Sequence, residues 1–157
     1  MQARNDSLAT AWPLPRIDAR HSPIIPMTIE LGGLPAFVVP GLHGSGHGHW
    51  QTLWQHAHPA WRRIQQDRWD VPLLPVWSRR VADVLAQTES PAILVAHSFG
   101  CLASMHAAVF RDAQIAAALL VAPADPAKFG VEAELMHGPL PFPVTVVASS
   151  NDPWLSL

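Results

Sequence analysis

The chain has little charge, a single cysteine and no tyrosine. Charged residues make up 14% of its 157 residues, and ten Lys and Arg against twelve Asp and Glu give a net charge of −2. Because no basic cluster stands out, the sequence gives no electrostatic support to a nucleic-acid or anionic-membrane partner. The one cysteine, Cys101, excludes an internal disulfide and a zinc site built on several cysteines.

Long apolar runs are also missing. No run reaches the ~18 residues that a membrane-spanning helix needs, and no basic segment followed by an apolar core marks a secretory signal. We therefore expect a cytoplasmic protein with no membrane partner. Apolar residues nevertheless make up 49% of the sequence, which is typical of an α/β domain whose faces are mostly covered.

Short apolar runs alternate with segments of helical periodicity. Strands are predicted over residues 34–40, 62–69, 91–97, 116–122 and 143–148, helices over 50–57, 76–88 and 101–110, and a loop over 125–142. This alternation predicts βαβ units and a three-layer α/β/α sandwich with a mostly parallel central sheet. In the first helix, Trp50, Leu53, Trp54 and Ala57 have the spacing of an amphipathic apolar stripe.

Residues 1–30 differ from the remainder of the chain. They contain four prolines among mixed polar residues and show no sustained periodicity. We expect a poorly ordered N-terminal extension there, followed by one domain over residues 31–157.

Ser98 lies where the apolar run 91–97 meets the helical pattern that follows. Ala96 and Gly100 are the small neighbours that a tight strand-to-helix turn needs, although Ala96 stands where glycine is usual. Such a turn projects the hydroxyl above the carboxyl edge of the sheet and is called a nucleophile elbow. Ser98 is therefore either a nucleophile or an ordinary helix N-cap.

An acid and two amides could complete a site at the same edge. Asp152 follows the last predicted strand, although Asp152-Pro153 could be only a turn, and Asp125 is the alternative acid. An oxyanion hole would use the backbone N–H of Phe99 and one N–H from the loop after the first strand, for which we choose Leu42. That glycine-rich loop lacks the known phosphate-binding patterns.

The sequence resembles the serine hydrolases of the α/β-hydrolase fold, and within them the small YdeN-type (retinoblastoma-binding-protein type) family. The matching segments are 39–41, 49–51, Trp54, Trp69, Trp77, 95–101, 119–125, 141–143 and 147–153. The resemblance implies that Ser98 is the nucleophile and Asp152 the triad acid. It also implies hydrolysis of small ester or amide substrates through an acyl-enzyme, without a cofactor or metal.

The histidine of the triad is missing. In this fold it follows the acid, but residues 153–157 contain none. We therefore expect a domain that lacks its C-terminal part and is nearly inactive. His97, His106 and His137 are poor replacements, because a misplaced base costs several orders of magnitude in rate.

Two other interpretations remain open. The missing histidine also fits a non-catalytic binding protein on a hydrolase scaffold. His43, His47 and His49 have spacings that could present imidazoles to zinc, although ordinary loop histidines explain them more simply. In either case, loss of the C-terminal part would leave an unpaired, apolar sheet edge, so we expect self-association through that edge.

Overall fold

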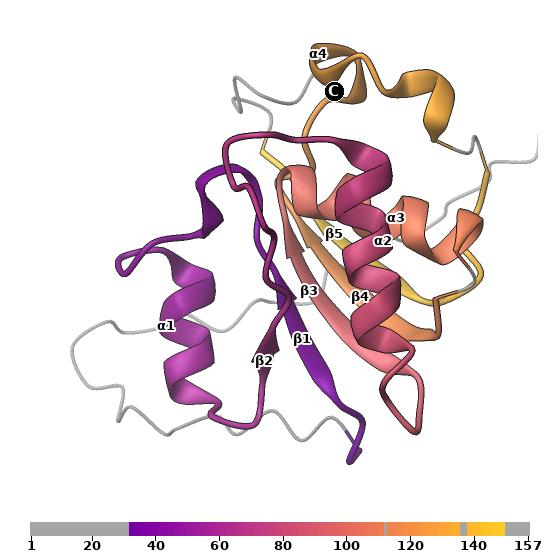
Figure 1. Cartoon of the computed structure of the whole chain (residues 1–157). Helices are drawn as coiled ribbons and strands as arrows, with labels where there is room; N and C mark the ends of the chain where they lie inside the picture. The colour runs from indigo at the N-terminus through magenta and orange to yellow at the C-terminus, as the bar shows by residue number, and fades with distance from the viewer. Residues whose placement is uncertain (1–31, 112, 136–137, 150–157) are drawn as a thin grey trace, which may run out of the picture.

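The computed structural model describes residues 32–111, 113–135 and 138–149, which form a parallel sheet flanked by helices (Figure 1). The strands are β1 (Ala36–Val39), β2 (Arg62–Arg63), β3 (Ala92–His97), β4 (Ile115–Val121) and β5 (Val144–Val147). The helices are α1 (Trp50–Ala57), α2 (Leu74–Leu85), α3 (Phe99–Phe110) and α4 (Pro126–Phe129), with short 3-10 turns η1 (Leu42–Gly44) and η2 (Glu132–Glu134). The predicted α/β fold with a parallel central sheet is confirmed.

Side chains alternate between the two faces of the sheet, and each face has its own core. Phe37 and Leu94 belong to the larger core, which the apolar faces of α2 and α3 complete. Val38 and Val95 belong to a smaller core on the opposite face, against which Trp50 of α1 packs. Figure 1 shows α2 and α3 side by side over the central strands. This division into two cores follows from the two-residue period of a strand and gives the three layers.

The strand order determines where a site can form. The order is β2-β1-β3-β4-β5, so the chain steps from β1 outward to β2 and then crosses back over β1 to β3. β1 and β3 pair in parallel, with Val39 opposite Ala96. The connections that leave β1 and β3 therefore diverge from neighbouring strand ends. At such a switch point, the carboxyl edge of a parallel sheet carries a crevice in which ligands bind.

Several predicted boundaries are wrong. The strand expected over 62–69 pairs only at Arg62 and Arg63. Helix α2 begins at Leu74, before the expected start, because Pro75 occupies the first turn, where its missing N–H is not needed. The segment 125–142, predicted to be a loop, contains α4 and η2. The side chain of Asp125 accepts a hydrogen bond from the Ala127 amide at 3.0 Å and caps α4.

The apolar stripe of α1 is buried only in part, because Trp50 packs against the smaller core but the next two members of the stripe do not. Leu53 and Trp54 are 54% and 39% exposed, whereas the buried residue of this helix is Gln51. The amide of Gln51 is satisfied by polar partners inside the protein, which removes the usual cost of burying it. A polar side chain therefore takes the place that hydrophobic periodicity assigns to the apolar stripe.

Two further expectations concern membrane-spanning helices and the N-terminal segment. Within the described ranges, no helix is both long and apolar enough to cross a membrane. The expected N-terminal extension, residues 1–30, lies outside the described residues.

Candidate active site

Ser98 joins β3 directly to α3 in a backbone conformation that serine rarely adopts. Its φ is 52° and its ψ is −124°, and a non-glycine residue held there costs about 1–3 kcal/mol. Its amide donates to the Val121 carbonyl at 3.1 Å, and its carbonyl accepts from the Cys101 amide at 2.9 Å. The turn is therefore anchored on both sides, to β4 and to the first turn of α3.

Ser98 occupies the N-cap position of α3 but does not act as a cap. Its side chain forms no capping hydrogen bond, and its positive φ differs from the extended conformation of an ordinary N-cap. Asp125 shows the contrast, since it has φ −68° and accepts a hydrogen bond from the first turn of α4. The capping role thus does not account for Ser98.

Two glycines permit the close approach between this turn and the end of β1. A Cβ atom at Gly100 would lie 2.5 Å from both the Val39 and the Pro40 carbonyl oxygens. A Cβ at Gly41 would lie 2.7 Å from the Cβ of Ser98 and 3.3 Å from its Oγ. Real Cβ atoms essentially never come within 3.0 Å of such neighbours. The loop after β1 is therefore pressed directly against Ser98.

This arrangement brings together the two segments that the sequence assigned to an oxyanion hole. Leu42 follows Gly41 in the loop, and Phe99 follows Ser98 at the start of α3. The amides of the next two loop residues already form hydrogen bonds within the protein. His43 donates to the Trp69 carbonyl at 3.0 Å, and Gly44 donates to the Gly41 carbonyl at 3.1 Å. As the first residue of its helix, Phe99 has an amide without an intrahelical acceptor.

Aromatic rings pack around Phe99, the first residue of α3. The Phe99 ring is fully buried and lies 5.2 Å from the Trp77 ring and 4.8 Å from the Phe129 ring. Trp77 in turn meets Trp69 edge-on at 5.6 Å. Trp69 packs where a side chain on Gly44 would be, 2.9 Å from that Cβ position. One chain of aromatic contacts thus links the loop after β1 to the turn at Ser98.

The two candidate acids differ in what the structure says of them. Asp152 lies outside the described residues, so its assignment as the acid stays a prediction. Asp125 follows β4 at the same edge of the sheet, but its carboxylate is engaged in capping α4. Its placement gives it a local structural role.

The described histidines lie in different surroundings. The His97 ring packs against the rings of His49, at 4.6 Å, and of Trp50, at 6.1 Å. His106 is buried in α3 beside the Phe110 ring, and burial lowers its pKa below the ordinary value of 6.5. Burial and then the charge of Arg63 lower the pKa of His49. His137 lies outside the described residues.

A metal site is not apparent at the loop histidines. Among the residues that the structure describes, no group of three or more His, Cys, Asp or Glu side chains is placed to hold a metal ion. His43, His47 and His49 fall within the described part of the chain and do not form such a group. The Nδ1 atom of His49 instead accepts a hydrogen bond from the Gln51 amide at 3.2 Å, which caps α1.

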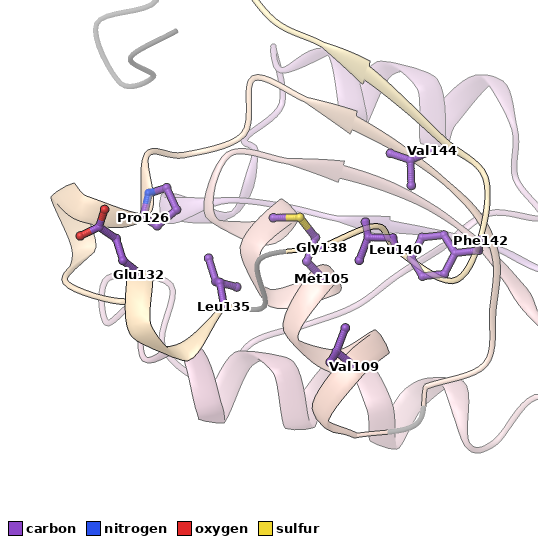
Figure 2. A pocket seen from close by; sticks show the side chains of 9 residues that line it. All are labelled: Met105, Val109, Pro126, Glu132, Leu135, Gly138, Leu140, Phe142 and Val144. Carbon is purple, nitrogen blue, oxygen red and sulfur yellow. The ribbon is translucent and has the colours of Figure 1, made fainter.

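An apolar cavity of about 500 Å³ lies along α3, and Ser98 is not one of its lining residues (Figure 2). Its lining includes Met105 and Val109 from α3, Leu135, and Phe142 and Val144 near the start of β5. Met105 follows Ser98 by about 10 Å of helical rise. The lining also includes Pro126 and Glu132, so the cavity extends from the segment that follows β4 to the start of β5.

Sequence reasoning assigned no role to two residues of the site's surroundings, Arg63 and Gln51, although Gln51 belongs to the family-like segment 49–51. Gln51 is fully buried and bonds to the Val39 and Val95 carbonyls, which are near the ends of β1 and β3. Arg63 donates hydrogen bonds to the Gly44 and Ser45 carbonyls of the loop. Local periodicity does not predict these contacts, because most of the partners are far away in the sequence.

Comparisons with known proteins support the family and the fold. A family model described as Serine hydrolase matches residues 36–157. Among solved structures, the chain is similar to a YdeN-like hydrolase from Pectobacterium atrosepticum, with 38% sequence identity and a TM-score of 0.75. The match covers 78% of this chain and 66% of that one, so this chain spans slightly less than two thirds of its relative's length. Comparison with curated proteins gives no significant match.

Proposed function

Because the chain belongs to the serine hydrolase family, we propose that Ser98 is the nucleophile of an ester or amide hydrolase. The predicted likeness to YdeN-type proteins is confirmed by the solved relative. The observation that carries the assignment is the strained turn at Ser98. Its side chain makes no capping bond there, and the glycine-rich loop after β1 lies directly against it. Strain of this kind is concentrated at functional sites.

In the proposed reaction, Ser98 Oγ forms a bond to the acyl carbonyl carbon and gives its proton to a base. The carbonyl oxygen takes up the electron pair as an oxyanion, which the amides of Leu42 and Phe99 would bind. The carbonyl then re-forms, the bond to the alcohol or amine breaks, and the leaving group takes the proton. Water hydrolyses the resulting acyl-enzyme by the same steps.

The proposed base is an imidazole that Asp152 would orient. In this fold the histidine follows the acid, whereas residues 153–157 contain no histidine. Of the described histidines, His97 packs among aromatic rings and His106 lies about 12 Å of helical rise beyond Ser98. We therefore propose that these 157 residues react slowly on their own.

A fluorophosphonate probe tests the assignment, because it forms a stable bond with an activated serine. We expect slow labelling that mass spectrometry maps to Ser98, and none at that peptide in Ser98→Ala. Added imidazole should accelerate the labelling, because it can accept the serine proton. Ser104→Ala is the matched control, since Ser104 lies in α3 and donates to the Gly100 carbonyl at 2.8 Å.

The possible outcomes separate the parts of this proposal. Rapid labelling of the 157-residue chain without imidazole would contradict the absence of a base. Failure to label Ser98 even with imidazole would instead favour the alternative, a binding protein on a hydrolase scaffold.

A further inference from the structure

The loop between β1 and α1 is strained and needs external support. Three consecutive residues, His43, Gly44 and Ser45, have φ values of 64°, 76° and 52°. Glycine tolerates this region, but His43 and Ser45 carry a Cβ atom and are strained in it. The loop carries Leu42 and lies against Ser98, so a small change in its path would move the Leu42 amide.

Arg63 holds this loop from the side of β2. Its Nη1 donates to the Gly44 carbonyl at 2.7 Å and to the Ser45 carbonyl at 3.3 Å. Its Nη2 donates to Thr52 Oγ1 at 2.8 Å, and Thr52 Oγ1 donates to the Ser45 carbonyl at 2.6 Å. The planar guanidinium thus fixes two successive carbonyls of the strained segment and ties them to α1. A lysine ammonium could donate to the carbonyls but would lack the rigid planar geometry that also holds Thr52 Oγ1.

Gln51 holds the same loop from inside the protein. Its Oε1 accepts a hydrogen bond from Ser45 Oγ at 2.7 Å, and its Nε2 donates to the Val39 carbonyl at 3.2 Å and to the Val95 carbonyl at 2.9 Å. β1 leads into the loop and β3 leads into Ser98. One side-chain amide therefore joins the loop to the ends of both strands that build the site.

We propose that Arg63 and Gln51 are positioning residues that keep the Leu42 amide directed at the oxyanion formed on Ser98. The inference rests on the proposed function and adds to it the two side chains that act through the loop. A fully satisfied buried polar network rigidifies a core and specifies one arrangement. At this loop, that arrangement holds Gly41, the residue before Leu42, against Ser98.

The test measures the rate of fluorophosphonate labelling at Ser98 in the presence of imidazole, separated into kinact and KI. For Arg63→Met and Gln51→Met we expect kinact to fall about 10- to 100-fold with KI changed less than about threefold, since misplacing an oxyanion donor acts on the transition state. Arg63→Lys should recover part of kinact, because an ammonium can still donate to the Gly44 and Ser45 carbonyls.

A control separates positioning from general stability. Leu85 is buried in α2, away from the loop, and Leu85→Ala should lower the melting temperature because it leaves a cavity in the core. It should keep the kinact of the original chain below its melting temperature. Gln51→Met is nearly isosteric, so it provides the test if Arg63→Met does not fold.

The labelling results separate the role of Ser98 as nucleophile from the positioning roles of Arg63 and Gln51. If the original chain is not labelled at Ser98, the proposed function fails and this inference falls with it. If the original chain is labelled and both Met variants react at its rate, only the inference is overturned. It is also overturned if Leu85→Ala loses as much kinact as the Met variants, or if Arg63→Lys recovers none.

Discussion

Substitution of Gly100 by alanine should damage both the stability of the fold and the turn that carries Ser98. The added Cβ would lie 2.5 Å from the Val39 and Pro40 carbonyl oxygens, where contacts below 3.0 Å essentially never occur. Both atoms belong to the backbone at the end of β1, so neither can rotate away. Overpacking typically costs about 1–3 kcal/mol, and a double clash with backbone belongs at the upper end.

We therefore expect Gly100→Ala to lower the free energy of unfolding by about 3 kcal/mol. For a chain of this size that corresponds to a melting temperature lower by about 6–12 °C. Urea unfolding followed by tryptophan fluorescence measures the change. Gly46→Ala is the matched control, because nothing lies within 4 Å of its Cβ position. Equal unfolding midpoints for the two variants would refute the close approach between α3 and the end of β1.

Three further predictions follow from burial and exposure. Burial lowers the pKa of His106, so the protein should lose stability as the pH falls below 6.5, the ordinary pKa of histidine. In urea titrations at several pH values, His106→Phe should reduce this loss of stability. An unchanged dependence of stability on pH in that variant would contradict the prediction. Burial raises the pKa of the Cys101 thiol far above its usual range, so iodoacetamide should alkylate Cys101 only after unfolding, and rapid alkylation of the native chain would be inconsistent with its packing. Val146 and Val147 on the edge strand β5 are 57% and 49% exposed. The chain should therefore self-associate through β5, and Val146→Lys should reduce the association. A monomer at every concentration in sedimentation experiments would refute this.

The central layer of the fold could be predicted because its signals are local. Apolar runs such as Ala92–Ala96, ended by Pro or a turn, identify strands that are buried on both faces. The position of Ser98 between such a run and a helical pattern is equally local. The family resemblance, which rests on motifs spread along the chain, is confirmed by the comparisons.

The support of the site could not be predicted, because it depends on contacts that are distant in sequence. Hydrophobic periodicity selects Leu53 and Trp54 as the inner face of α1, but the acceptors at the ends of β1 and β3 determine that Gln51 is buried. The Val95 carbonyl lies 44 residues from Gln51. Likewise, a strand of only two residues positions Arg63, whose partners belong to another loop. Asp152 stays a prediction, as do the oxyanion roles of Leu42 and Phe99.

The most direct test of the central claim is to find where the acyl group of an activated ester is deposited. After reaction with p-nitrophenyl acetate in the presence of imidazole, tandem mass spectrometry should place an acetyl group on Ser98. Ser104→Ala should behave in the same way, and Ser98→Ala should carry no acetyl group at that peptide. Acetylation elsewhere, to the same extent in the original chain and in Ser98→Ala, would contradict the assignment of Ser98 as the nucleophile.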